Sequence, residues 1–152
     1  MSFGTKDTGE EFVIKYLFTE EVTKPASVTV GLYDDSTDAL SDAGDVGDIT
    51  TEPSDGNYAR LTYDFGTTDF SSATDSNNDW QSVFATKTYD LTDTTGMVDG
   101  FFVVINYQAE GETAANDHLF TTDALRDSTG AATTYDLSQI SSGDFDGTFT
   151  VQ

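Results

Sequence analysis

Alternation of apolar and polar side chains at a period of two residues is the feature that most constrains the fold of this chain. Val28, Val30 and Leu32 alternate with small or polar residues, which predicts a half-buried strand over residues 27–33. Residues 101–107 are apolar at nearly every position, which predicts a central strand covered on both faces. Further strands are predicted at residues 59–65, 83–91, 118–122, 133–137 and 145–151.

The only helical pattern lies in the first 25 residues, where apolar side chains form one stripe. The stripe consists of Phe12, Val13, Tyr16 and Leu17. Thr8 and Glu11 have the spacing of a capping box, which predicts that the helix begins at Thr8. Pro25 ends the pattern, because the residue before a proline is pushed out of the helical region.

About seven strands without intervening helices predict an all-β fold. We expect a single domain that consists of a helical segment at residues 1–25 and an antiparallel β-sandwich, jelly-roll-like, at residues 26–152. No repeat of fixed period and no long linker divides the chain.

The charge of the chain excludes several classes of partner. Its 28 acidic and 6 basic residues give a formal net charge of -22. Such a surface repels phosphate backbones and anionic lipids, so we expect neither nucleic acid nor a membrane as partner. The chain has no cysteine, which excludes disulfides and thiol nucleophiles. Its longest strongly apolar run, residues 101–105, is far shorter than the ~20 residues that span a bilayer, and we expect no signal peptide.

The types of charged and polar residue indicate the salt concentration in which the protein works. Asp outnumbers Glu by 21 to 7, Thr occurs 25 times, and lysine is scarce. This composition is typical of proteins from extreme halophiles, because at 1 M salt the Debye length falls to ~3 Å and an acidic excess is tolerated. Salt also strengthens the association of apolar surfaces. The alternative is an acidic protein from an environment of ordinary salt concentration, or a protein that binds calcium.

Two acidic loops are candidate sites for a hard cation. Asp75, Asn77 and Asp79 have the alternating oxygen spacing of a calcium loop, but Trp80 stands where an EF-hand requires glycine. The second loop contains Asp34, Asp35, Asp38, Asp42, Asp45 and Asp48. With so many aspartates such spacings arise by chance, so the competing interpretation is solvated loops that attract counterions. A bound Ca²⁺ or Mg²⁺ is therefore a weak candidate, and no other cofactor is expected.

Catalytic motifs are not recognisable. No Gly-x-Ser-x-Gly elbow and no phosphate-binding loop is present, and no carboxylate pair stands out among the acids. The sole histidine, His118, is expected on the surface or at a strand edge. Trp80 is a candidate surface for stacking on sugars, with core packing as the alternative, and Arg60 is expected to pair with an acid across the sheet or at a subunit interface. We expect a protein without enzymatic activity.

The order of segments resembles a family of small virion proteins of tailed viruses, usually labelled tail-fibre-like. The motif Val-x-Val-Gly-Leu occurs at residues 28–32 and is followed by Glu-Pro-x-x-Gly-x-Tyr-Ala-Arg at residues 52–60. The later strands are collinear with that family, but its usual Trp-Gly-x-Val stretch is replaced by Gly-Met-Val-Asp-Gly at residues 96–100.

Together with the halophilic surface, the resemblance implies a virion structural protein of a tailed virus of halophilic archaea: a capsid turret, decoration or tail-associated subunit assembled in the host cytoplasm. Expected partners are copies of itself and other capsid or tail proteins. The host surface is a further candidate partner. The helical stripe of Phe12, Val13, Tyr16 and Leu17 is the predicted contact between subunits or with the shell. The alternative is a calcium- or carbohydrate-binding β-sandwich module without catalysis.

Overall fold

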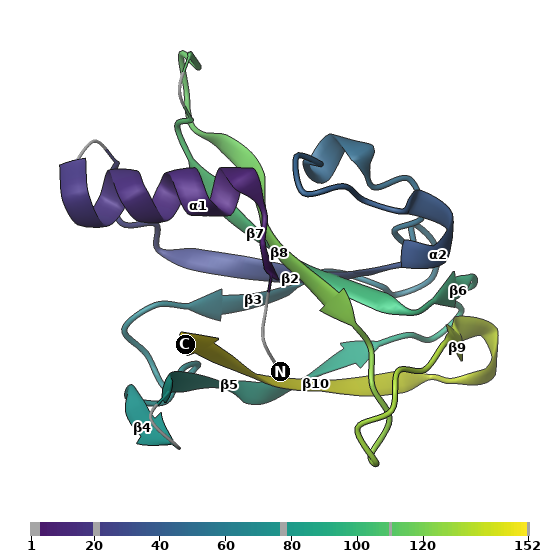
Figure 1. The fold of residues 1–152 in the computed structure, drawn as a ribbon. Coiled ribbons are helices and arrows are strands. Elements are labelled where there is room, and N and C mark those ends of the chain that lie inside the picture. The colour runs from purple at the N-terminus through teal and green to yellow at the C-terminus, as the bar shows by residue number, and fades with distance from the viewer. Residues whose placement is uncertain (1–3, 20–21, 77–78, 110, 152) are drawn as a thin grey trace.

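The computed structural model describes the backbone of residues 4–19, 22–76, 79–109 and 111–151, and the side chains of residues 6–19, 22–73, 82–109 and 111–146 (Figure 1). All strand pairings within these residues are antiparallel. The chain is therefore β-rich, with antiparallel sheets and one N-terminal helix, as the sequence predicts. In the described part of the chain no helix has the length and apolar character needed to cross a membrane.

Two main sheets and a small ribbon make up the strands. The five-stranded sheet has the order β1 (Gly4–Thr5), β8 (Asn116–Ala124), β7 (Gly100–Tyr107), β2 (Ser27–Tyr33) and β3 (Leu61–Asp64). The three-stranded sheet has the order β10 (Ser142–Val151), β5 (Asp79–Asp90) and β4 (Thr74–Ser76). The ribbon pairs β6 (Met97–Val98) with β9 (Tyr135–Asp136).

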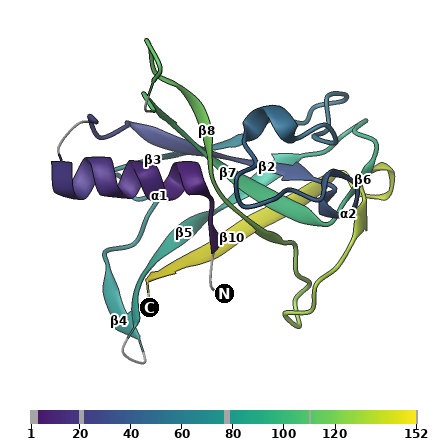
Figure 2. The ribbon, with the colours of Figure 1, turned by 45° about the horizontal axis from the view of Figure 1, so that its top comes forward.

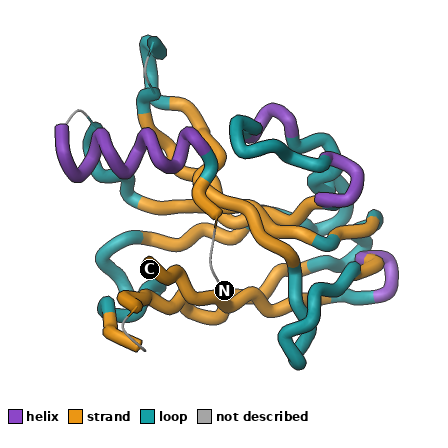
Figure 3. The backbone as a smooth tube through the Cα atoms, in the orientation of Figure 1, coloured by secondary structure: helices purple, strands orange, loops and turns teal. Residues whose placement is uncertain are grey.

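The helical elements lie at the periphery of the strands (Figure 3). They are α1 (Asp7–Ile14), the π-helical turn η1 (Lys15–Thr19), α2 (Asp35–Asp38), and the 3-10 turns η2 (Val46–Asp48) and η3 (Leu137–Gln139). Figures 1 and 2 place α1 and the loop that carries α2 on opposite sides of the five-stranded sheet. They meet at the start of the helix, where the ammonium group of Lys6 donates to the carbonyl of Ser41 at 2.9 Å and the amide of Asp7 donates to the carbonyl of Asp42 at 3.2 Å.

The strand predictions for residues 27–33 and 101–107 are confirmed. β2 spans the predicted residues, and β7 lies between β8 and β2 with its side chains buried on both faces. The prediction for residues 133–137 is wrong in part, because only two residues pair as β9 before the chain turns into η3. β1, β4 and β6 were not predicted, since two- or three-residue strands carry no period and exist only through their partners.

The predicted capping box is wrong. α1 begins at Asp7, its N-cap is Lys6, and no side chain caps its first amides. Thr8 lies inside the first turn, and its hydroxyl donates instead to the carbonyl of Leu119 on β8 at 2.5 Å. A contact with the sheet thus replaces the local cap. Asp7 and Glu10 still occupy the first turn, where the helix dipole favours negative charge.

The main core lies between the two sheets. Val30, Tyr63, Phe101 and Phe145, from β2, β3, β7 and β10, belong to one buried cluster. The aromatic rings in it meet mostly edge to face: Tyr63 lies 5.0 Å from Phe84, and Phe101 lies 5.0 Å from Phe145. Such contacts are more favourable than burial of their area alone.

A second, smaller cluster covers the other face of the five-stranded sheet. Tyr33, Phe102, Val104 and Leu119 are buried there. The loop between β2 and β3 covers them with three partly buried apolar side chains: Leu40, Val46 and Ile49. This explains why β7 is apolar on both faces, because its odd-numbered side chains face the second sheet and its even-numbered ones face this loop.

Candidate functional site

The first two turns of α1 are anchored on the edge of the five-stranded sheet. Gly9 packs so closely that a Cβ atom there would overlap the carbonyl of Phe120. The hydroxyl of Tyr107 donates to the carbonyl of Thr8 at 2.7 Å. Phe12 is only 9% exposed and its ring lies 5.3 Å from that of Tyr107. The helix is therefore part of the domain's own core.

The continuation of the helix carries large apolar side chains that are exposed in the described structure, although the Tyr16 ring stacks on Phe12 at 5.7 Å. Ile14 is 53% exposed, Leu17 61% and Phe18 75%, while Tyr16 is 37% exposed. We call these four residues, at the end of α1 and in η1, the helix end. In the described residues only Val83 and Met97 add further exposed large apolar side chains. Clustering of this kind on one short segment marks interaction surfaces in soluble proteins.

The predicted contact stripe is thus divided by the structure. Phe12 belongs to the main core, and the half-buried Val13 packs against that core. Tyr16 and Leu17 are exposed, and Ile14 and Phe18, which are not part of the predicted stripe, lie with them. The spacing of Ile14 and Phe18, one helical turn apart, was the signal that could have found them.

The acidic loop at residues 34–48 does not converge on one point. Asp34 accepts hydrogen bonds from Ser36 and Thr37, and Asp38 accepts from Thr50 and Thr51. Asp34 caps α2, and Asp45 and Asp48 form the capping box of η2. These carboxylates hold the loop's own turns together. No three or more His, Cys, Asp or Glu side chains are grouped to hold a metal ion within the described residues.

The second acidic segment is the connection of a hairpin. Asp75 pairs with Trp80 and Ser76 with Asp79 between β4 and β5. Asn77 and the side chains of Asp75, Asp79 and Trp80 lie outside the described residues, so the calcium loop and the Trp80 surface stay predictions.

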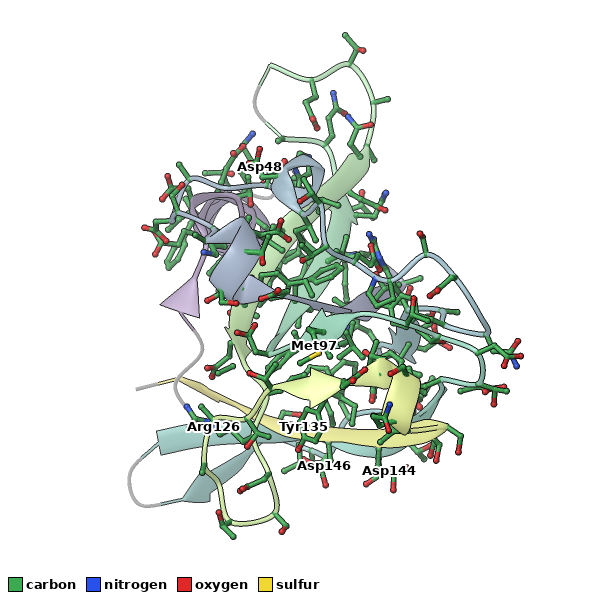
Figure 4. All side chains as sticks on the ribbon, turned by 90° about the vertical axis from the view of Figure 1, so that its right-hand side faces the viewer. Asp48, Met97, Arg126, Tyr135, Asp144 and Asp146 are labelled. Carbon is green, nitrogen blue, oxygen red and sulfur yellow. The ribbon has the colours of Figure 1, made fainter. Side chains whose placement is uncertain are left out.

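Acidic side chains also decorate the outer face of the three-stranded sheet. Asp144 and Asp146 lie two residues apart on β10, and both are exposed and point away from the sheet (Figure 4). The hydroxyl of Thr88 on β5 donates to Asp144 at 2.6 Å. Short carboxylates and hydroxyls thus face solvent on this side of the sheet.

His118 is buried, so of the two expected positions, on the surface or at a strand edge, the surface position is wrong. Its side chain is 6% exposed and lies between two carboxylates. Nδ1 is 3.1 Å from Asp45 and Nε2 is 3.0 Å from Glu112, and the ring packs 4.8 Å from that of Tyr107. Burial opposes protonation of the ring, but the hydrogen bonds to Glu112 and Asp45 outweigh it and raise the pKa of His118 above its ordinary value of 6.5.

The His118 cluster predicts a pH-dependent stability. Because the folded-state pKa of His118 is raised, its contribution is full below the ordinary pKa of 6.5 and is lost as pH rises through the folded-state pKa. Replacing His118→Gln should cost about 2 kcal/mol below pH ~6, the size of hydrogen bonds to a charged group, and less at higher pH. Guanidinium unfolding of both proteins across this range measures the difference, and a difference independent of pH would contradict it.

The second motif of the resemblance forms one hydrogen-bonded network. Arg60 donates through Nε and Nη2 to the two carboxylate oxygens of Glu52, at 2.8 and 2.7 Å. The hydroxyl of Tyr58 donates to Glu52 at 3.0 Å and accepts from the amide of Leu32 at 2.9 Å. The Arg60 guanidinium lies 4.9 Å from the ring centroid of Phe102. Arg60 thus finds its acid in the preceding loop of its own chain, and the motif ties that loop to the sheet.

Comparison with protein-family models, curated proteins and solved structures found no match to this chain. The likeness to tail-fibre-like virion proteins therefore stays a prediction. Within the described residues, the candidate site with the clearest physical signature is the helix end, because it is the one group of large apolar side chains gathered on a single exposed segment.

Proposed function

We propose that this protein is a structural subunit that associates with copies of itself through the helix end. The observation that carries the proposal is the exposure of Ile14, Leu17 and Phe18 next to an anchored, buried Phe12. A helix held rigidly at one end presents these side chains without further ordering, which lowers the entropic cost of association. The two sheets, which share one core, are the rigid body of a β-sandwich in this proposal.

High salt favours such an assembly. Subunits of net charge -22 repel one another in dilute buffer, but the Debye length of ~3 Å at 1 M salt confines that repulsion to close contacts. Apolar contacts at the helix end strengthen under the same conditions. The subunit therefore assembles in brine and dissociates when salt is removed.

The setting we propose for this subunit is the virion of a tailed virus of halophilic archaea, as a turret, decoration or tail-associated protein. The proposal is supported by the motifs at residues 28–32 and 52–60, the halophilic composition and the exposed helix end. Other capsid or tail proteins would then be further partners. Mass spectrometry of purified virions tests the setting, and their lacking this chain would contradict it.

The double variant Leu17→Asp, Phe18→Asp should abolish self-association. Each buried apolar side chain contributes about 1.5–3 kcal/mol, so losing two raises the dissociation constant by at least about 100-fold. Sedimentation velocity in ~2 M KCl, where repulsion is screened, measures the change. The control is Met97→Asp, which places one negative charge on an exposed apolar residue of β6, away from the helix end.

Near-UV dichroism of each variant shows whether the fold is intact, since the substituted side chains are exposed and contribute little to the core. The wild type and Met97→Asp should form the same oligomer. A wild type that stays monomeric at every concentration in molar salt would end the proposal, as would a double variant that assembles as well as the control.

A further inference from the structure

An apolar cavity of about 340 Å³ lies between α1 and the two sheets. Five phenylalanines contribute to its walls: Phe12, Phe65, Phe70, Phe84 and Phe120. The central strands β2 and β7 add three aliphatic side chains to the walls: Val28, Val103 and Ile105. The only hydroxyls among the described lining residues belong to Ser82 and Thr121.

Its size and lining are those of a ligand site. Protein interiors pack to crystal-like density and keep few voids larger than a water molecule. Apolar cavities of ~150 Å³ stay dry and take up small apolar molecules, and ligand pockets begin at ~300 Å³. At roughly 30 Å³ per heavy atom, the share of one water in the liquid, the cavity holds about eleven atoms of a hydrocarbon. The walls offer almost nothing to hydrate or orient a polar group.

A cation lies beside the cavity. The ammonium group of Lys24 lies 5.3 Å from the ring centroid of Phe65, which lines the cavity, and Lys24 is exposed. It is one of only 6 basic residues in the chain. Arg60, Lys87 and Arg126 are engaged by carboxylates, whereas Lys24 forms no ion pair with another described residue. Within the described residues no carboxylate pairs with this charge, so a ligand that emerges from the cavity beside Phe65 can meet it.

We infer that the cavity binds a free single-chain amphiphile, with the hydrocarbon tail among the phenylalanines and an anionic head group at Lys24. The apolar walls select the tail, and the lone cation next to Phe65 selects the sign of the head. A membrane surface does not fit, because many anionic head groups would meet a protein of net charge -22. One screened carboxylate in molar salt meets only its local cation.

Calorimetric titration with decanoate and with decanol tests this site on the full chain in ~2 M KCl, where long-range repulsion is screened. Both ligands should bind one per chain at submillimolar concentration, and decanoate should bind about fivefold more tightly, as expected of one exposed ion pair. Both should also raise the melting temperature, because they bind only the folded state.

Three variants separate the parts of the site. Lys24→Ala should remove the preference for decanoate and leave decanol binding unchanged, while Arg126→Ala, the same loss of charge at a residue that does not line the cavity, should change neither. Val103→Phe fills the cavity from β7, and Ser82→Leu fills it from β5 if the first variant fails to fold. Either filled variant should lose at least tenfold in affinity for both ligands.

Absence of decanoate binding by the wild type overturns the inference. So does binding that survives in the filled variants with an intact near-UV spectrum. An unchanged ratio of the two affinities in Lys24→Ala overturns the assignment of the head group. None of these results depends on self-association, since Leu17 and Phe18 do not line the cavity and the double variant can be titrated as a monomer.

Discussion

Transfer from ~2 M KCl to ~0.01 M KCl is expected to lower the melting temperature of this protein by at least about 10 °C and to dissociate its oligomer. At the lower concentration the Debye length grows to ~30 Å, so charges across the whole domain repel one another. Each pair of like charges costs only a fraction of a kcal/mol in water, but a net charge of -22 creates many pairs. Their sum is comparable with the ~5–15 kcal/mol of a typical net stability.

Thermal melts followed by near-UV dichroism across the KCl range measure this effect. The triple variant Asp42→Asn, Asp64→Asn, Asp146→Asn is the control for charge, because these exposed carboxylates have no side-chain hydrogen bond in the described structure. Its melting temperature should depend less on salt than that of the wild type. A wild type that melts at the same temperature throughout would refute the halophilic interpretation of the composition.

Gly31→Ala is expected to destabilise the domain by about 3 kcal/mol, at the upper end of the cost of overpacking a core. Gly31 on β2 is paired with Phe102 on β7, and a Cβ atom at Gly31 would overlap the Cζ atom of that ring. Phe102 has no exposed surface, and the Arg60 guanidinium lies 4.9 Å from its ring centroid. Glu52 holds Arg60 in turn, so a shift of the ring toward Arg60 would have to disturb this ion pair.

Gly47→Ala is the matched control, because the same added methyl group would meet no atom within 4 Å. Thermal melts in molar salt should separate the two variants, with a loss of about 10 °C in melting temperature for Gly31→Ala and little change for Gly47→Ala. Equal stability of both would show that the β2–β7 pair adjusts more freely than its packing indicates.

The strands that the sequence predicted well are those whose signal is local. In β2 apolar and polar side chains alternate, and in β7 nearly every side chain is apolar. Each pattern reflects whether one or both faces of the strand are buried. The helix was predicted for the same reason, but its start was not. Thr8 had the spacing of a cap, and the sheet placed the Leu119 carbonyl within reach of its hydroxyl instead. A local preference such as helix capping is overridden when a distant part of the fold offers the side chain another hydrogen-bond partner.

The candidate site could be predicted only in part. The apolar stripe on the helix is visible in the sequence, but burial of Phe12 and exposure of Leu17 depend on where β8 meets the helix. The setting of His118 could not be predicted, because Asp45 is 73 positions away along the chain. With 28 acidic residues, no spacing rule selects the two that face one histidine.

By itself, the sequence determined the β-rich class, the N-terminal helix and the acidic, lysine-poor surface. These properties follow from composition and from the spacing of neighbouring residues, and they need no knowledge of distant contacts. Only the tertiary structure decided which apolar side chains remain exposed at the helix end, where a cavity stays open among the phenylalanines, and which carboxylates are occupied by hydroxyls and amides. Those outcomes depend on contacts between residues far apart in the chain, whose partners are fixed by sheet register and by the packing of the two sheets.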